Sequence, residues 1–273
     1  MFVIYQGSGG VIHLLGGLVY CIEWCQKNNH HLIIDIKNHI SFKNNFDDFF
    51  YIKQFTKYSY NYDIIPNNIK YFQGMPLERI KSINACRKKD DKGRYLPGYW
   101  IDNLSICCSL ESYKRSDIIK MYVGHGGNMH FNIIRYIGVK PDIINICKEK
   151  DQITSRFIGV HFRNTDRIND INTYINNIKK QKNKLIYLAT DDSMAFDIFV
   201  LRLDTYEIIQ YTKPFNGNGQ PIHIVSNNMY EVILNLIIDM YMLLKCDIFI
   251  PSPASLVSKL ITLMRNNKKN IFT

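Results

Sequence analysis

Apolar residues near the start of the chain fall into short continuous runs separated by a segment with helical spacing. A run at Phe2–Tyr5 predicts a strand, and the glycine-rich segment Gly7–Gly10 predicts a turn. Apolar positions within Val11–Lys27 recur at helical spacing, and Leu32–Ile36 is a second run that predicts a strand. This strand–helix–strand opening implies parallel strands joined by a right-handed crossover.

The second half of the chain shows the same alternation more regularly. Four apolar runs predict strands at Phe157–Phe162, Lys184–Thr190, Tyr206–Gln210 and Asp247–Pro251. Helical spacing predicts helices at Ile171–Gln181, Met194–Leu203, Met229–Lys245 and Ala254–Arg265. Strands at this spacing with helices between them predict a doubly wound α/β lobe.

The middle of the chain has a less regular pattern. Residues 40–94 are rich in aromatic side chains and asparagine, and periodicity does not fix the order of elements over residues 53–120. Further along, the glycine-rich segment Tyr122–Asn128 precedes a predicted helix at Met129–Ile137.

A boundary between two lobes is predicted near residues 140–155. Pro141 interrupts the pattern, and the charged segment Lys148–Asp151 follows it. We place the boundary so that one Rossmann-like lobe spans residues 1–145 and a second spans residues 146–273. A chain of 273 residues has room for two lobes, because a domain typically takes about 100–200 residues.

The composition is that of a globular protein. Hydrophobic residues make up 46% and charged residues 21%, which excludes a disordered chain and a membrane-embedded one. The formal net charge of +10 is compatible with a nucleic-acid partner or a phosphorylated substrate. Because Lys, Asn, Ile and Tyr are abundant even in loops, we interpret this charge as compositional bias plus a local phosphate site. Basic residues are scattered apart from Arg87–Lys92 and Arg265–Lys269, so no nucleic-acid partner is expected.

The cysteines and the longest apolar stretch bear on the compartment. There are seven cysteines, an odd number, and most lie in apolar runs, which indicates free packed thiols. Cys21 and Cys25 have no second pair at metal-ligand spacing, so no zinc site is expected. The sequence opens directly on a strand without a signal-peptide pattern, and Val232–Leu244 is interrupted by Asn235 and Asp239. We therefore expect a cytoplasmic protein without a membrane span.

Ligands of open α/β sheets bind just beyond the carboxyl ends of the strands, so each strand exit of the second lobe is a candidate site. The first exit, Ile158–Arg167, passes from an apolar strand to His, Arg and Asp. Alternation places His161 and Arg163 on the same side of the strand, and the arginine fork suits phosphate oxygens. Asp166 is a candidate partner for these groups or for a substrate hydroxyl. A solvated, salt-bridged turn is the alternative, but it does not explain a histidine within the strand.

The second exit, Thr190–Ser193, offers Asp191 and Asp192 ahead of a predicted helix. Carboxylates bind ribose hydroxyls or guanine N–H donors, but Asp and Ser are also ordinary helix N-caps. Spacing alone does not decide between the two interpretations. The adjacent pair is not an Asp-x-Asp metal motif, so no divalent cation is implied.

The third exit places Ser252 and Ser255 at the start of a helix. Backbone N–H groups at a helix start bind anions, and simple capping with Pro253 in the first turn is the alternative. In the first lobe, Gly9 and Gly10 allow a ligand to approach the backbone closely at a strand-to-helix turn. This turn is not a GxGxxG pattern, and alone it does not identify a ligand.

Taken together, four segments resemble the α1,6-fucosyltransferase family. They are GSGGVIHLLGGLVYC followed by LIID, then IGVHFRNTDR, LIYLATDD and CDIFIPSPASLVSKLITLM. Their order and spacing agree with the family, whose second segment usually reads His-x-Arg-Arg-Thr-Asp, whereas residues 40–150 show little that matches. The resemblance implies a GT-B-like α/β fold, in which two Rossmann-like, doubly wound lobes face each other across a cleft. The N-terminal lobe would be the acceptor side, and the C-terminal lobe would bind the GDP-sugar.

The resemblance also implies an activity. Fucose would move from GDP-fucose to a glycan hydroxyl with inversion, without a metal and without a cofactor besides the donor substrate. By resemblance, Arg163 would bind the β-phosphate, and Ser255 would support the phosphates. His161 and one of Asp191 or Asp192 would hold the nucleoside.

The chain departs from the family motif at two places. Asn164 replaces the second arginine, so phosphate binding rests more heavily on the first arginine, with Arg167 as a further candidate. The family's carboxylate base aligns near Ile171, one position after Asp170. We therefore take Asp170 as the candidate base that accepts the acceptor's proton, with Asp166 as its substitute.

Three other interpretations stay open at this point. A GT-B enzyme for another nucleotide sugar, including a relative of protein O-fucosyltransferases, would use the same arginine. A non-catalytic binding protein would fit the missing second arginine and the displaced carboxylate. A nucleic-acid-binding protein would need basic side chains clustered with stacking aromatics.

The aromatic-rich Phe49–Tyr62 is expected to be core rather than a sugar-stacking platform.

Overall fold

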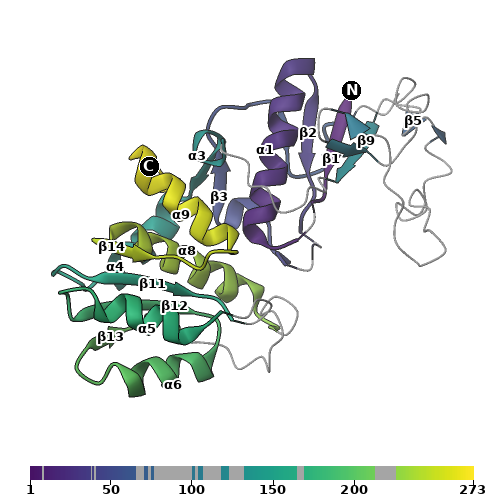
Figure 1. Ribbon diagram of the computed structural model, residues 1–273. Helices are drawn as coiled ribbons and strands as arrows, with labels where there is room; N and C mark the ends of the chain where they lie inside the picture. The colour runs from purple at the N-terminus through teal and green to yellow at the C-terminus, as the bar shows by residue number, and fades with distance from the viewer. Residues whose placement is uncertain are drawn as a thin grey trace, which may run out of the picture. The chain divides into compact units, whose positions relative to one another are not determined.

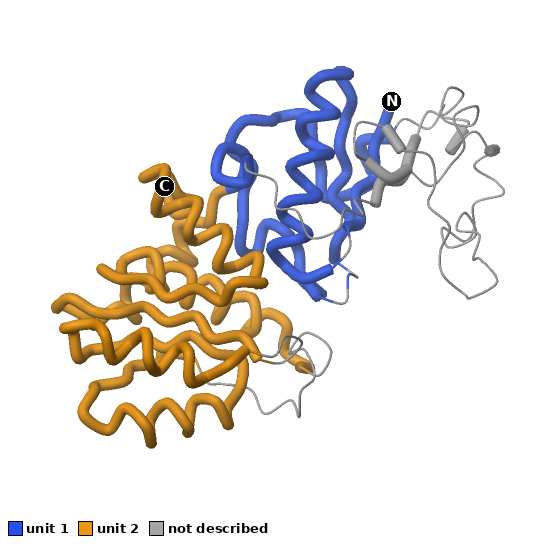
Figure 2. The backbone as a smooth tube through the Cα atoms, in the orientation of Figure 1, with its two compact units in different colours: residues 1–137 blue, residues 138–273 orange. Residues whose placement is uncertain are grey.

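The computed structural model describes residues 1–7, 9–37, 39, 41–65, 71–72, 75–76, 100–101, 104–106, 118–122, 132–164, 169–212 and 226–273. The chain divides into two compact units, unit 1 (residues 1–137) and unit 2 (residues 138–273), which Figure 2 colours separately. The boundary expected between residues 145 and 146 falls inside helix α4 (Pro141–Lys150). Pro141 does not break a helix there, because proline fits the first helical position, and the charges that follow belong to the last turn.

The sheet of unit 1 is centred on three parallel strands. Strand β1 (Phe2–Tyr5) lies between β2 (His31–Ile34) and β9 (Ile118–Tyr122), and β2 pairs in parallel with β4 (Tyr58–Ser59). Helix α1 (Val11–Asn28) connects β1 to β2, so the predicted strand–helix–strand opening is confirmed. The remaining strands of this sheet are β5 (Tyr71–Phe72), β6 (Met75–Pro76), β7 (Trp100–Ile101) and β8 (Leu104–Ile106).

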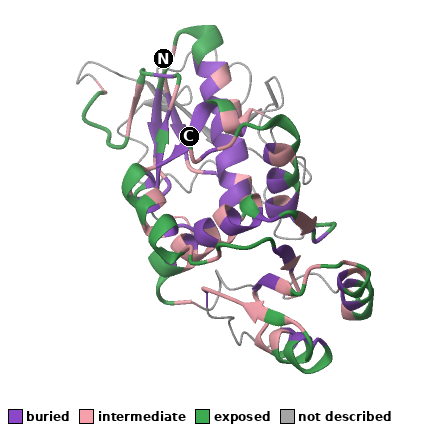
Figure 3. Cartoon of the chain, turned by 90° about the vertical axis from the view of Figure 1, so that its left-hand side faces the viewer, coloured by how far each residue is buried: buried purple, intermediate pink, exposed green. Residues whose placement is uncertain are grey.

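Helix α1 supplies much of the core of unit 1. It is buried along most of its length (Figure 3), which explains why its sequence is apolar on more than one face. The aromatic-rich segment after β2 contains η1 (Phe46–Asp48) and β3 (Phe50–Ile52). Within Phe49–Tyr62, the side chains of Phe49 and Phe50 are at most 1% exposed and form core, as expected. Tyr51, Tyr60 and Tyr62 are 36%, 36% and 40% exposed, so the expectation of core is wrong for these three residues.

The helix predicted at Met129–Ile137 is shorter in the structure. Residues 129–131 lie outside the described residues, and α3 covers only Ile133–Tyr136. The chain then becomes extended in β10 (Ile137–Val139), because a glycine between two β-branched residues favours a strand over a helix. The glycine-rich segment at 123–128 also lies outside the described residues.

Unit 2 contains a four-stranded parallel sheet in the order β13–β12–β11–β14. The strands are β11 (Ile158–Phe162), β12 (Leu185–Thr190), β13 (Glu207–Ile209) and β14 (Ile248–Ile250). The helices besides α4 are α5 (Ile171–Lys179), α6 (Ser193–Arg202), α8 (Met229–Lys245) and α9 (Leu256–Asn267). Every strand and helix predicted for this half of the chain is present, with ends that differ by a few residues. In the described part of the chain, no helix is long and apolar enough to cross a membrane.

Alternation along β11 assigns its side chains to two helical layers. Ile158, Val160 and Phe162 join one buried cluster with residues of α5 and α6. The positions between them face α8 and α9, which lie on the other side of the sheet (Figure 1). At Gly159 an added Cβ would lie 2.6 Å from the Cys246 sulfur, so only glycine allows this close approach. His161 is the next residue on the same side of the strand.

Arg265 fixes α9 against the end of α8. Its guanidinium donates hydrogen bonds to the carbonyls of Leu243, Leu244 and Cys246 at 3.3, 3.1 and 2.6 Å. It also donates to the Asp247 carbonyl at 3.1 Å. These carbonyls close the C-terminus of α8, where a cation is favourable. Through this contact one side chain holds the last turn of α9 against the end of α8.

Candidate functional site

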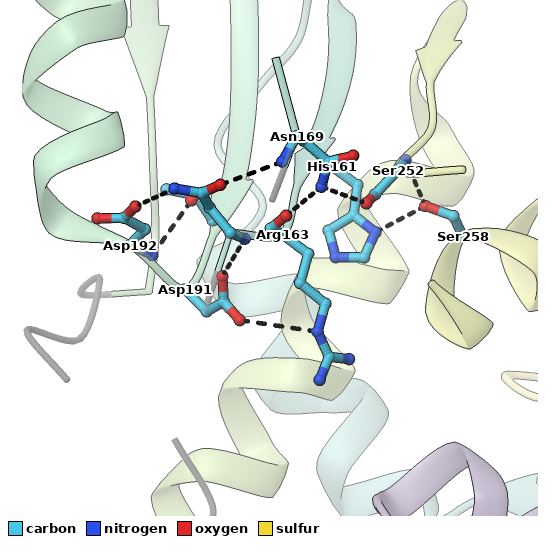
Figure 4. A network of polar contacts seen from close by, with 9 residues as sticks. His161, Arg163, Asn169, Asp191, Asp192, Ser252 and Ser258 are labelled. Carbon is cyan, nitrogen blue, oxygen red and sulfur yellow. Dashed lines mark hydrogen bonds and ion pairs between the residues drawn. The ribbon is translucent and has the colours of Figure 1, made fainter. Parts of the chain in front are cut away.

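The first strand exit of unit 2 is joined to α9 through two serines. His161 is partly buried, and its Nδ1 lies 2.7 Å from the Oγ of Ser258 (Figure 4). The same Oγ accepts a hydrogen bond from the backbone N–H of Ser252 at 2.8 Å. Ser258 is 2% exposed and Ser252 is 1% exposed, so both contacts are shielded from water. Sequence reasoning missed Ser258, whose only signal is its position one helical turn after Ser255.

These contacts favour one tautomer of His161. The Ser258 oxygen can accept two hydrogen bonds, so the contact from Ser252 does not by itself set its role towards the histidine. The Ser258 proton needs an acceptor, however, and among the described residues that acceptor is Nδ1 of the imidazole. Burial, together with the nearby charge of Arg163, lowers the pKa of His161 to about 3, so the ring is neutral near pH 7. A neutral ring that accepts at Nδ1 carries its proton on Nε2. His161 therefore presents an N–H donor rather than a cation at the edge of the sheet.

Arg163 follows His161 on the same side of the chain and lies near the second strand exit. Its Nε is 4.0 Å from Oδ2 of Asp191, and the two side chains are 28% and 22% exposed. Asp191 also accepts from the backbone N–H of Asn164 at 3.1 Å. Figure 4 shows the terminal nitrogens of the guanidinium pointing away from Asp191. The carboxylate thus orients the arginine from its Nε side, and the fork of the guanidinium points beyond the strand.

Asn164 and Asn169 join the three strand exits to one another. The Asn164 amide donates to Asp192 at 2.8 Å, while Asp192 also caps α6 by accepting from two backbone N–H groups. Asn169 donates to the Arg163 carbonyl and lies 3.4 Å from the Ser252 Oγ. The structure therefore uses Asn164 as a link between strands β11 and β12. Sequence reasoning missed Asn169, because an asparagine in a loop carries no distinctive signal.

The two candidate bases differ in what the structure shows of them. Asp170 is the N-cap of α5 and accepts from the backbone N–H groups of Asn172 and Thr173 and from both of their side chains. These hydrogen bonds, the Thr173 hydroxyl foremost, lower the pKa of Asp170. A carboxylate with a lowered pKa is a poorer proton acceptor, so the geometry favours a capping role for Asp170. Asp166 and Arg167 lie outside the described residues.

The start of α9 has the features of an anion site. Ser255 stands at the N-cap position and is 3% exposed, but its side chain caps no backbone N–H. Its buried Oγ has no hydrogen-bond partner in the part of the chain that the structure describes. The first-turn N–H groups of a helix also lack intrahelical partners and attract negative charge. A buried hydroxyl without a described partner thus stands at a helix end that favours negative charge.

A buried carboxyl that sequence reasoning missed lies on the α8 side of the sheet. Asp239 accepts from the Tyr187 hydroxyl at 2.7 Å and from the Thr212 hydroxyl at 3.1 Å. Burial raises the pKa of Asp239 to about 7, and the charge of Asp191 adds to this rise. The sequence shows it only as an acidic residue that interrupts an apolar helix. This signal predicts a buried polar contact, because an acidic side chain that faces a sheet from an apolar helix needs hydrogen-bond donors.

The glycine-rich turn of unit 1 is explained largely by its own backbone. Gly7 and Gly9 have φ of +65° and +78°, a region that favours glycine. An added Cβ at Gly9 would lie 2.5 Å from Nδ1 of His13. Gly10 is the N-cap of α1, and no described atom lies within 4 Å of a Cβ built there. Of the two predicted glycines, only Gly10 leaves open space for a ligand.

Cysteines and acidic groups elsewhere form no metal site in the described part of the chain, since no cluster of three or more His, Cys, Asp or Glu residues occurs there. The four described cysteines are free and buried, as expected of packed thiols: Cys21, Cys25, Cys147 and Cys246.

Comparison with known proteins identifies the fold. No protein-family model and no curated protein matches the chain. The solved structure of fucosyltransferase NodZ from Bradyrhizobium matches with a TM-score of 0.51 at 16% identity, over 95% of this chain and 92% of that one. POFUT1 in complex with GDP-fucose matches with a TM-score of 0.56 at 12% identity, over 97% and 94% of the chains. POFUT1 in complex with GDP gives 0.57 at 12% identity.

The chain has the fold of these fucosyltransferases. The expected GT-B-like α/β architecture, with parallel sheets in two units, is thereby confirmed. At these identities the likeness establishes the fold and not the activity. That the two lobes face each other across a cleft stays a prediction.

Proposed function

We propose that this chain is a fucosyltransferase that moves fucose from GDP-fucose to a glycan hydroxyl, with inversion and without a metal. The observation that carries the proposal is the convergence of three strand exits of unit 2 on one polar network around His161 and Arg163. Ligands of parallel sheets bind at this edge. The fold supports the choice of donor, because NodZ, which has a similar structure, is a fucosyltransferase, and the similar POFUT1 structure is a complex with GDP-fucose.

The donors at the sheet edge suit a nucleoside diphosphate that gains charge as it leaves. Arg163 would bind the diphosphate through the fork of its guanidinium, oriented by Asp191. The Ser255 hydroxyl and the first N–H groups of α9 would bind further phosphate oxygens. His161 would donate its Nε2–H to an oxygen of the nucleotide. Donors fixed before the reaction stabilise the developing charge in the transition state.

The proton of the acceptor hydroxyl needs a carboxylate. Asp170 is engaged as a helix cap by four hydrogen bonds, which disfavours it as the base. We therefore assign the base to Asp166, the second of the two candidates, because Asp170 is engaged as a cap. Activity of Asp166→Asn and Asp170→Asn tests this assignment, because only loss of the base should stop transfer while GDP-fucose still binds.

Calorimetry with GDP-fucose tests the donor site. Wild type is expected to bind, and Arg163→Ala is expected to bind at least about tenfold more weakly, because a charge-assisted bidentate contact is lost. Arg156→Ala is the matched control, since this exposed arginine lies in the same unit and pairs only at the surface, 3.7 Å from Asp247. GDP-mannose and UDP-glucose serve as competing donors. Equal heats from Arg163→Ala and wild type would refute the assignment of Arg163.

A second candidate, a non-catalytic binding protein of this fold, rests on Asn164 and Asp170. Asn164 stands where the family has a second arginine, and its side chain links two strands instead. The Asp170 carboxylate caps α5. Such a protein would bind GDP-fucose but release no GDP from it, with or without acceptor glycans. A transferase for another nucleotide sugar would instead give heat with GDP-mannose or UDP-glucose and none with GDP-fucose. Cytoplasmic placement and a role in glycan biosynthesis stay predictions.

A further inference from the structure

Unit 1 has a polar edge of its own, at the carboxyl ends of three adjacent parallel strands. Gln6 follows β1, Asp35 follows β2, and Tyr60 and Tyr62 come just after β4. The strands lie in the order β4–β2–β1, so these exits are neighbours along one edge of the sheet. The sequence predicts the two tyrosines only as core, within Phe49–Tyr62, and it singles out neither Gln6 nor Asp35 as a site residue.

Asp35 is the centre of this group. Its Oδ2 accepts from the Gln6 amide at 2.5 Å and from the Tyr62 hydroxyl at 2.6 Å. The backbone N–H of Asp35 donates to the Tyr5 carbonyl at 2.9 Å, which fixes the main chain at the same point. Both side-chain donors use one oxygen. Among the described residues, none donates to Oδ1, so a carboxylate held in a fixed orientation keeps one acceptor oxygen available.

The two tyrosines that follow β4 are partly exposed to solvent, and Tyr62 is the one with a described contact to Asp35. Tyr62 is 40% exposed and Tyr60 is 36% exposed, and the Tyr60 ring is stacked on buried Phe46 with centroids 6.0 Å apart. A ring fixed from behind by the core loses little conformational freedom when a ligand packs on its outer face. The edge therefore combines an aromatic surface with a few oriented polar groups, which is the usual make-up of a small-ligand site.

The chemistry of this edge fits a sugar ring with adjacent hydroxyls. A carboxylate at the end of the second strand, after a glycine-rich turn and a helix, accepts hydroxyl protons of ribose in other α/β folds. We propose that Gln6, Asp35 and Tyr62 form a sugar subsite in unit 1, in which Asp35 Oδ1 accepts from a ring hydroxyl and the tyrosines contact the ring. Its ligand would be the acceptor glycan, a choice that rests on the proposed function.

Saturation-transfer NMR tests the subsite without requiring catalysis. The probes are the methyl glycosides of glucose, galactose, mannose and N-acetylglucosamine, and GDP is the nucleotide arm. Wild type is expected to transfer saturation to the ring protons of at least one glycoside. Asp35→Asn is expected to weaken that binding about tenfold or more, because a charged acceptor is lost. Tyr62→Phe, which keeps the ring but removes the hydroxyl, should weaken it less.

Two variants away from this edge serve as controls. Asp142→Asn removes an exposed carboxylate of α4, and Tyr51→Phe removes the hydroxyl of a tyrosine that is 36% exposed. Neither should change glycoside binding. The proposal is overturned if no glycoside binds wild type, if Asp35→Asn binds as wild type does, or if only the ribose of GDP responds to Asp35→Asn. Calorimetry with GDP-fucose separates the two proposals, because Asp35→Asn should leave donor affinity unchanged even where glycoside binding is lost.

Discussion

The carboxyl ends of the parallel strands in the two units hold their polar side chains in different ways. In unit 2, groups from three strand exits and one helix are linked to each other, so that Asn169 contacts the exits of both β11 and β14. In unit 1, the side chains of Gln6 and Tyr62 converge on one carboxylate oxygen of Asp35. The polar groups of unit 2 therefore form a network, whereas those of unit 1 orient a single residue, Asp35.

The difference determines how far the effect of a substitution should spread. Residues that share partners are coupled energetically, so removing one member of the unit 2 network should disturb the others. Removing the side chain of Gln6 or of Tyr62 should leave Asp35 oriented, since Asp35 keeps its other partner. The predictions below test the network side of this comparison, from the largest expected effect to the smallest.

Arg163→Ala is expected to have the largest effect. Loss of a charge-stabilising donor typically lowers turnover roughly 100- to 1000-fold, which is about 3–4 kcal/mol in the transition state. The measurement is the rate of GDP release from GDP-fucose in the presence of acceptor. Arg156→Ala should keep the wild-type rate. Near-normal turnover by Arg163→Ala would show that the network surrounds a residue with no catalytic role.

Arg265→Ala is expected to have the next largest effect, on stability. The substitution leaves four carbonyls at the end of α8 without their charged donor. We expect the free energy of unfolding to fall by about 2–3 kcal/mol, measured by urea denaturation. Lys259→Ala, at an exposed position of the same helix, should change it by less than about 0.5 kcal/mol. Equal midpoints for the two variants would mean that Arg265 does not hold α9 in place.

The two units also differ in how far the sequence predicted them. Every predicted element of unit 2 is present, because short apolar strands alternating with amphipathic helices leave few alternative folds. In unit 1 the opening was equally clear, but the helix expected at Met129–Ile137 gives way to a strand at Ile137. Local spacing over nine residues did not reveal where tertiary pairing takes over from helix formation.

For the candidate site, sequence identified the strand exits but not the links between them. His161 and Arg163 stand out because a polar residue within or just after an apolar strand costs free energy unless it has a hydrogen-bond or charge partner. Ser258, Asn169 and Asp239 did not stand out. Their roles depend on which helix lies against which strand, and no local pattern encodes that. An aspartate just before a predicted helix indicates an N-cap, and Asp170 is the N-cap of α5. The family resemblance instead assigned it the role of base.

Ser258→Ala tests whether the network sets the tautomer of His161. We expect the imidazole proton to redistribute between Nδ1 and Nε2 and GDP-fucose affinity to fall about tenfold, since a positioned donor is lost. NMR of the imidazole nitrogens reports the tautomer, which a purely structural loss would not move. Thr262→Ala, at an exposed position of α9, is the control. An unchanged Nε2–H tautomer in Ser258→Ala would assign Ser258 to packing alone.

The smallest expected effect is on how the free energy of unfolding depends on pH. Folding lowers the pKa of His161 and raises the pKa of Asp239. Burial lowers the pKa of His161 from 6.5 to about 3, so the unfolded chain binds a proton that the folded chain does not. Stability from this group therefore falls as pH drops below about 6.5. Burial raises the pKa of Asp239 from 3.8 to about 7, so the folded chain keeps a proton that the unfolded chain has lost. Stability from this group falls as pH rises towards about 7.

Because the two trends oppose each other, their sum in wild type should be nearly flat between about pH 5 and pH 7. Asp239→Asn should expose the histidine trend, so that unfolding free energy rises with pH by about 1 kcal/mol over this range, discounted for partial exposure. His161→Gln should expose the opposite slope, with a similar size. Urea denaturation of the three proteins at several pH values measures both slopes. Parallel curves for all three would mean that neither group titrates differently in the folded chain, and the neutral, donating form of His161 would lose its support.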